Sequence, residues 1–219
     1  VRLLPESSTF FHHGDDDAFG GGAGKFVPKK SVSRSIQLYQ KLVDAGIHML
    51  TVHGRTRYNK GTETGEADWD AIAQVVDAIG DRIPVIANGS IQTCRDVREC
   101  IEKTGVDGVM SSEAILEYPA LFEDFHTPQH CRRRRAPLDL ALEYLDLAEQ
   151  YPPDQNGQGS GLKCIRMHIH RFLHADLQNY TNVRKLVIDA QSIHELRNAL
   201  LVLGDTAAAA AAHVDRQRS

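Results

Sequence analysis

Small polar residues follow three short apolar runs, and their types suit the binding of a phosphorylated cofactor. The runs cover residues 49–52, 83–87 and 107–110, and the clusters after them are His53 to Arg57, Asn88 to Ser90, and Ser111 to Glu113. Glycine lets a backbone approach a phosphate closely, and serine hydroxyls and backbone N–H groups can donate hydrogen bonds to it. We therefore predict a phosphate site at the second and third clusters, with two ordinary strand-to-helix turns as the alternative.

The first cluster adds side chains that could bind an anionic or planar partner. His53 can donate a hydrogen bond to a cofactor ring or a phosphate, and the guanidinium groups of Arg55 and Arg57 suit anions and flat rings. The alternative for this cluster is a basic surface loop. Asn88 could hydrogen-bond a heteroaromatic ring or cap the turn that follows it.

The elements that position these clusters are predicted to be parallel strands and helices in alternation. Short, continuously apolar runs are typical of parallel strands that are buried on both faces. Helical spacing of apolar residues occurs at about 33–45, 68–79 and 93–103. Because ligands of parallel α/β folds bind at the carboxyl ends of the strands, the three clusters stand where a site is expected. The pattern indicates an α/β fold and part of a barrel.

The strand pattern stops after residue 122, and the rest of the chain is predicted to be helical. Helices are expected over 138–151, 162–177, 182–188 and 192–203. We expect an α/β domain over 1–126, a basic linker over 127–137 that contains Arg132 to Arg135, and a small all-α domain over 138–205. The Gly-rich segment at about 6–31 and the tail at 206–219 are expected to be disordered.

Composition narrows the class of protein without identifying a ligand. The 219 residues are 42% apolar and have a formal net charge of -4, which is ordinary for a soluble globular protein and gives no global case for nucleic-acid binding. No apolar stretch approaches the roughly 20 residues of a membrane span. The four cysteines show no CxxC spacing, so we expect reduced thiols and a cytosolic or nuclear location. His168, His170 and His174 lack the further ligands of a metal site, and no metal is expected.

Taken together, several motifs resemble those of the tRNA-dihydrouridine synthase family. The similarity is strong over about residues 32–122 and weaker through the helical part, and Met110-Ser111-Ser112-Glu113 is most similar to the eukaryotic branch that modifies positions 16 and 17 of the D-loop. The motifs are Leu50 to Arg57, Lys60-Gly61, Ala67-Asp68-Trp69, Ile83 to Ile91, Thr104 to Met110 and Pro119 to Phe122.

The resemblance implies a flavin enzyme that acts on tRNA. It implies a (β/α)8 barrel that binds FMN, followed by a helical domain that helps to hold tRNA. The implied oxidoreductase reduces the C5–C6 bond of uridine to 5,6-dihydrouridine, with NADPH reducing FMN. For this chain the implied fold is the C-terminal part of such a barrel, from the end of strand five to strand eight, and then the small helical domain.

The resemblance also implies roles for individual residues. The positions implied to bind FMN are His53, Asn88, Gly89, Ser90, Ser111 and Ser112. The positions implied to face tRNA are Arg55, Arg57, Lys60, Lys163, Arg166 and Arg171. Many family members have Gly-Arg-Gly near Ser111, with the arginine on the phosphate; here backbone and hydroxyl groups would serve instead.

Two departures from the family pattern concern its chemistry. No cysteine of this chain lies in the Asn-x-Gly-Cys-Pro setting of the family's catalytic acid, and the FMN-binding lysine would precede Val1. We therefore expect an N-terminally truncated, monomeric chain that is inactive alone. The other hypotheses are an FMN-dependent barrel oxidoreductase for a small molecule and a non-catalytic RNA-binding remnant. The arginine-rich linker and the helical tail disfavour the former, because a small substrate needs neither.

Overall fold

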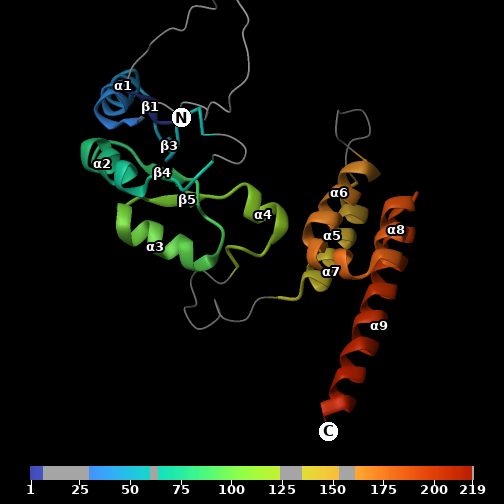
Figure 1. Cartoon of the computed structure of the whole chain (residues 1–219). Helices are drawn as coiled ribbons and strands as arrows, with labels where there is room; N and C mark the ends of the chain where they lie inside the picture. Colours follow the sequence, from blue (N-terminus) through green and yellow to red (C-terminus); the bar gives the residue numbers. More distant parts are fainter. Residues whose placement is uncertain (7–29, 60–63, 124–134, 153–160, 219) are drawn as a thin grey trace, which may run out of the picture. The chain divides into compact units, whose positions relative to one another are not determined.

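The computed structural model divides into two compact units, and each is described by itself. The first is Val1–Ser112 and the second is Glu113–Ser219 (Figure 1). The structure describes residues 1–6, 30–59, 64–123, 135–152 and 161–218.

The first unit is built on a parallel sheet with the strand order β3-β4-β5 (Figure 1). The strands are Leu50–His53, Val85–Asn88 and Gly108–Met110. The first residues of the chain extend this parallel arrangement, since Arg2 forms a parallel bridge with His53. The amino group of Val1 donates to the carbonyl of Thr51 over 2.8 Å, and the carbonyl of Val1 accepts from the N–H of His53 over 2.8 Å. A separate antiparallel pair joins β1 (Leu4–Pro5) to β2 (Lys30–Ser31).

Three helices pack beside the sheet and enclose the core of this unit. They are α1 (Val32–Asp44), α2 (Trp69–Ile79) and α3 (Cys94–Thr104), and α2 contacts β4 while α3 contacts β5. Alternate strand residues such as Val52 and Ala87 are fully buried, whereas their neighbours Thr51 and Ile86 are only half-buried. The expectation of strands buried on both faces is therefore wrong for the described part of the chain, where one face of the sheet remains partly open.

Local sequence signals explain where these helices begin and end. Asp68 caps α2 by accepting a hydrogen bond from the N–H of Ala71 over 2.8 Å, and Gly80 ends that helix, so α2 agrees with the helix predicted over about 68–79. Thr93 and Asp96 form a reciprocal capping box at the start of α3. These caps set the direction in which each helix leaves the loop that follows the preceding strand.

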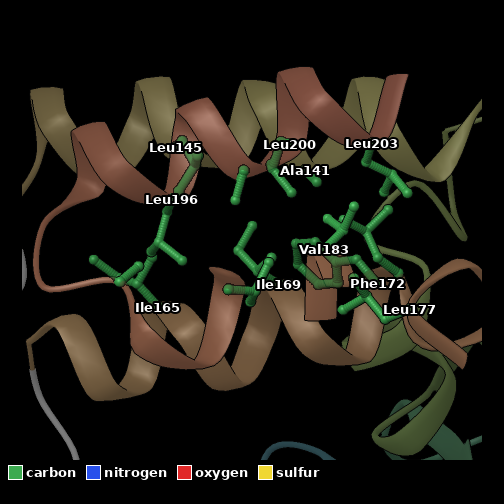
Figure 2. Packing of buried hydrophobic residues seen from close by; sticks show 14 of the residues in the cluster. Ala141, Leu145, Ile165, Ile169, Phe172, Leu177, Val183, Leu196, Leu200 and Leu203 are labelled. Carbon is green, nitrogen blue, oxygen red and sulfur yellow. The ribbon is translucent and has the colours of Figure 1, made fainter. Parts of the chain in front are cut away.

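Helices are the only regular secondary structure in the described residues of the second unit. It comprises α4 (Glu113–Glu117), α5 (Pro137–Gln150), α6 (Leu162–Phe172), α7 (His174–Asn179), α8 (Thr181–Asp189) and α9 (Ile193–Arg218). Apolar side chains from α5 to α9 meet in one cluster, in which Leu145, Ile169, Leu177, Leu196 and Leu200 are completely buried (Figure 2). The spacing of three and four residues between these apolar positions on each helix is what brings them to a common face.

Three expectations for the second unit and for the cysteines need correction. The predicted helix over 162–177 is two helices, because Leu173 has φ −106° and ψ 20° and interrupts the run. The tail at 206–218 continues α9, which agrees with the high helix propensity of its alanines. Cys94 is disulfide-bonded, whereas Cys100 and Cys164 are free thiols. Cys94 stands half-buried in the first turn of α3, whereas Cys100 is enclosed in the core.

Parts of the predicted organisation fall on residues that the structure does not describe. Residues 7–29 of the Gly-rich segment and 124–134 of the linker region belong to these gaps. Within the described ranges, no helix has both the length and the apolar character needed to cross a bilayer. No group of three or more potential metal-binding side chains occurs in the same ranges.

Candidate functional site

The carboxyl ends of β3 and β4 lie side by side, and this places His53 next to Asn88. The two residues are partners in the parallel register, and Asn88 is in turn paired with Met110 of β5. The Nδ2 of Asn88 donates to the Sδ of Met110 over 3.4 Å. Two residues predicted from the sequence as FMN contacts thus share one row across the sheet edge, on the face that the helices leave partly open.

The imidazole of His53 is neutral at physiological pH and has an unused polar atom. Burial, and after it the positive charges of Arg2, Arg55 and the chain's amino terminus, together lower its pKa to about 4. Its Nδ1 is buried and has no hydrogen-bond partner in the described structure. Because buried polar atoms are normally hydrogen-bonded, this nitrogen is available to a ligand placed at the sheet edge.

Gly89 follows β4 at a position where no side chain fits. Its φ is +102°, and a Cβ there would lie 2.9 Å from the Cβ of Ala67 and 3.1 Å from the Cε1 of His53. The carbonyl of Gly89 accepts a hydrogen bond from the indole Nε1 of Trp69 over 3.2 Å, which fixes the orientation of this peptide. The backbone beside His53 is therefore closely packed, with no room for a side chain, and is held in place.

Ser90 is the only described non-glycine residue with a positive φ, at 59°. Its Oγ accepts hydrogen bonds from the backbone N–H of Ala67 over 2.8 Å and from the Nη2 of Arg55 over 3.1 Å. These bonds explain how a serine keeps a left-handed conformation that costs about 1–2 kcal/mol for residues with a side chain. They use the two acceptor positions of the hydroxyl and leave its hydrogen available for donation.

Arg55 connects the loops that follow β3 and β4. Besides its bond to Ser90, it donates to the carbonyl of Gly65 from Nε over 3.0 Å and from Nη2 over 2.6 Å. The guanidinium thus organises the site in addition to any contact it makes with a substrate. Arg57 is exposed, with its guanidinium carbon 4.9 Å from the centre of the Tyr58 ring. Lys60, the third basic residue predicted for this loop, lies in the undescribed segment 60–63.

The end of β5 contributes differently from what the sequence indicated. The Oγ of Ser111 donates to the carbonyl of Ile91 over 2.8 Å and joins the loop after β5 to the loop after β4. Its hydrogen is therefore already used, and Ser111 offers its oxygen and its backbone to a ligand. Ser112 is exposed, so its hydroxyl faces solvent at the same strand end.

A hollow of about 490 Å³ lies beside this edge but does not coincide with it. It shares only Arg55 and Ser90 with the predicted site, and its other walls come from the start of α2, from α3 as far as Lys103, and from the segments that precede these helices. Those walls include Glu66, Asp68 and Asp96, which disfavour a phosphate. We therefore place the candidate anion site at the strand ends and not in this hollow.

The basic residues predicted for the helical unit are spread along α6. Lys163 is exposed in its first turn, and Arg166 lies one turn further on and donates from Nη1 to the carbonyl of Ile188 at the end of α8. Arg171 stands near the other end of α6 and pairs with Glu113 over 3.3 Å. The ammonium group of Lys163 thus has no ion pair or hydrogen bond within the described ranges, whereas the two arginines also serve the packing of this unit.

Sequence reasoning missed two contributors to the site. Arg2 bridges to His53 and donates from Nη1 to the carbonyl of Thr56 over 2.9 Å, and Trp69 holds the carbonyl of Gly89. Both are contacts between segments that are distant in the sequence. The Ala67-Asp68-Trp69 motif was the one signal that could have pointed to Trp69.

A unit of parallel strands and helices with polar residues at the carboxyl edge of its sheet, together with a helical unit, defines an α/β protein. A family model described as dihydrouridine synthase matches residues 28–211. The chain belongs to the dihydrouridine synthase family.

Individual relatives agree with this assignment. The mouse protein named tRNA-dihydrouridine(16/17) synthase [NAD(P)(+)]-like is 41% identical over 154 residues, which are 70% of this chain and 29% of that relative. A fission yeast tRNA-dihydrouridine(16/17) synthase [NAD(P)(+)] is 31% identical over 69% of this chain and 37% of its own length. Probable tRNA-dihydrouridine synthase 1 of Synechocystis is 36% identical over 75% of this chain and 45% of its own length. The chain therefore spans less than half the length of these relatives.

Proposed function

We propose that this chain supplies the phosphate and ribityl side of an FMN site, and an RNA-contacting helical unit, to an enzyme that reduces uridine in tRNA to 5,6-dihydrouridine. The relatives are named as tRNA-dihydrouridine synthases, and two of the names include NAD(P)(+) as the nicotinamide cofactor. The single observation that supports the site best is the buried, unpartnered Nδ1 of His53 beside Asn88 at the strand ends.

The residues at this edge fit a bound FMN. Gly89 lets the backbone pack closely against His53 and Ala67, where a Cβ would collide, and Ser90 retains a hydroxyl hydrogen for a phosphate oxygen. Neutral His53 and the amide of Asn88 can hydrogen-bond ring or ribityl atoms. We assign Ser111 and Ser112 to the phosphate end, where they act through an oxygen, a backbone N–H and an exposed hydroxyl.

We further propose that the sheet is part of a (β/α)8 barrel. The parallel bridge from Arg2 to His53 and the order β3-β4-β5 correspond to the end of strand five and to strands six, seven and eight. The partly open face of the sheet, which carries Thr51, His53 and Asn88, would then face the barrel interior. In a barrel the ligand lies over the carboxyl edge of the strands, where the candidate residues stand.

When bound, FMN supplies the hydride for the C5–C6 bond of uridine, and NADPH restores it. The residues of this chain bind and orient the flavin and the RNA. His53 stays uncharged and offers its unpartnered Nδ1 to the ligand, and Arg55 keeps the loops after β3 and β4 in place. Arg57 and Lys60, together with Lys163, Arg166 and Arg171, would bind RNA phosphates. We propose that the part of tRNA that is bound and modified is the D-loop.

Electrophoretic mobility shift with tRNA, run beside flavin fluorescence quenching, tests this function. We expect the chain to shift tRNA and to quench FMN weakly but saturably. RNA binding without flavin would favour a non-catalytic RNA-binding chain, and flavin binding without RNA would favour a small-molecule oxidoreductase. An absence of both would contradict the proposed function.

A further inference from the structure

Three titratable side chains form a connected cluster in the helical unit. Cys164 and His168 lie four residues apart on α6, with the Sγ of Cys164 3.7 Å from the Nε2 of His168. On the other side of the ring, the Nδ1 of His168 lies 2.7 Å from the hydroxyl oxygen of Tyr144 on α5. A thiol, an imidazole and a group that orients the imidazole are the parts of an activated nucleophile.

Aromatic packing fixes the imidazole of His168 in this position. The ring of Phe172 is stacked with it at an interplanar angle of 16° and a centroid distance of 6.4 Å. The ring of Tyr144 stands edge-on to both, with centroid distances of 5.5 Å to His168 and 5.3 Å to Phe172. The Nε2 atom is therefore directed to the sulfur by contacts on both sides of the ring, and not by the Cys164 interaction alone.

The chemistry at the sulfur follows from which groups are protonated. Burial raises the pKa of Tyr144 above its usual range, so its hydroxyl is protonated at neutral pH and can donate to Nδ1. The Nε2 then has the ring hydrogen and can donate it to the sulfur; in the other tautomer Nε2 accepts a hydrogen bond from the thiol. The thiol also lies in the first turn of α6, where the helix dipole favours a negative charge.

We propose that Cys164 is a site of oxidative modification, at which hydrogen peroxide converts the thiol to a sulfenic acid. The sulfur attacks one peroxide oxygen, the S–O bond forms and the O–O bond breaks. The departing hydroxide takes up the thiol proton and leaves as water, so sulfur is oxidised and peroxide is reduced. This site is independent of the proposed flavin function.

Cys100 provides an internal comparison within the same chain. Its side chain is completely buried on α3, and burial raises the pKa of its thiol. A buried thiol in apolar surroundings is expected to be inert, whereas Cys164 is only half-buried and has an imidazole beside it. The two free cysteines should therefore differ strongly in reactivity while the protein is folded.

The experiment treats the full chain with hydrogen peroxide at pH 7 in the presence of dimedone, which traps sulfenic acids, and follows each cysteine by peptide mass spectrometry. We expect Cys164 of the folded chain to react about tenfold faster than the same residue in the urea-unfolded chain, because the imidazole of His168 lies beside the sulfur only in the folded chain. Cys100 should remain unlabelled in the folded chain.

Variants test whether the faster labelling of Cys164 depends on His168 and Tyr144. Tyr144→Phe removes only the hydroxyl, and His168→Gln removes the imidazole; both should slow labelling of Cys164 severalfold. His170→Gln, on the same helix, is the matched control and should leave the rate unchanged, with circular dichroism reporting the fold of each variant. A rate in the folded chain no higher than in the unfolded chain would overturn the proposal. A wild-type rate in folded His168→Gln would overturn it as well.

Discussion

The Nη2 of Arg55 lies 3.1 Å from the Oγ of Ser90, and this hydrogen bond joins the loop after β3 to the loop after β4. The same oxygen accepts a bond from the N–H of Ala67, in the segment before α2. One hydroxyl therefore fixes three segments at the edge where His53 and Asn88 stand. The relationship makes Arg55 a positioning residue for the candidate flavin site.

Replacing Ser90 by alanine should destabilise the first unit by about 1–3 kcal/mol, because the N–H of Ala67 and the guanidinium of Arg55 lose their common acceptor. Urea unfolding monitored by tryptophan fluorescence measures this, since Trp69 lies in the same unit. Ser112→Ala is the matched control: its hydroxyl is exposed, and the change should stay within about 0.5 kcal/mol. Equal unfolding midpoints for the two variants would contradict the bridging role of Ser90.

Gly89→Ala should lower the free energy of unfolding more than an alanine that replaces another glycine of similar φ. Gly46 has φ +94°, and no atom lies within 4 Å of the position that a Cβ would take there, so Gly46→Ala measures the backbone strain alone, about 1–2 kcal/mol. At Gly89 the collision with Ala67 and His53 should add about 1–3 kcal/mol. The difference between the two free energies of unfolding is the quantity to measure. A difference near zero would show that the backbone beside His53 is not closely packed.

His53 should titrate near pH 4, well below the usual pKa of histidine of about 6.5. The folded-state pKa is lowered, so the unfolded chain binds more protons between these two values. The contribution of His53 to stability is therefore complete above about pH 6.5 and is lost as the pH falls toward 4. The Cε1–H chemical shift of His53 in an NMR titration gives the pKa directly. A transition between pH 6 and 7 would contradict the buried, uncharged imidazole.

His53→Gln should flatten the part of the pH–stability curve that this residue causes. The variant lacks the group that must take up a proton on unfolding, so it should lose less stability than the wild type between pH 6.5 and 4. Urea unfolding at both pH values provides the comparison. An identical loss in both proteins would assign the acid sensitivity to other groups.

Lys163→Ala should weaken tRNA binding without lowering stability, because its side chain is exposed and makes no ion pair or hydrogen bond with any described residue. If one phosphate contact is lost, the slope of log K against log salt should become about one unit shallower. Lys41→Ala, exposed on α1 of the other unit, is the control and should leave the slope unchanged. Arg166→Ala should in addition destabilise the helical unit, since Arg166 donates to the carbonyl of Ile188. Equal salt slopes for wild type and Lys163→Ala would remove Lys163 from the interface.

Sequence reasoning succeeded where a signal is local. The cap at Asp68, the stop at Gly80 and the capping pair of Ser192 and Glu195 follow from residue type and short spacing. Glu195 returns its hydrogen bond to the N–H of Gln191, one residue earlier than a standard box requires. The strand ends were also predictable. A continuous apolar run indicates a buried strand, and the polar cluster after it marks the residue at which the strand ends.

The features of the fold and of the candidate site that were not predicted depend on contacts that no local sequence pattern encodes. The bridge from Arg2 to His53 and the ion pair from Lys30 to Asp68 at 2.9 Å join segments that are far apart in the sequence. The left-handed backbone of Ser90 is stabilised by Ala67 and Arg55, so serine's own preferences give no indication of it. Likewise, a pattern of apolar spacing continues through Leu173 although the helix does not.

The most direct test of the central claim is a titration of the isotope-labelled chain with FMN, followed in ¹H–¹⁵N NMR spectra. The candidate site predicts saturable shifts that concentrate on the amides of Gly89, Ser90, Ser111 and Ser112 and on the ring of His53. Riboflavin, which lacks the phosphate, should shift the serine amides much less. Contradiction would come from an absence of saturable shifts, or from shifts confined to the hollow over α2 and α3 or to the helical unit.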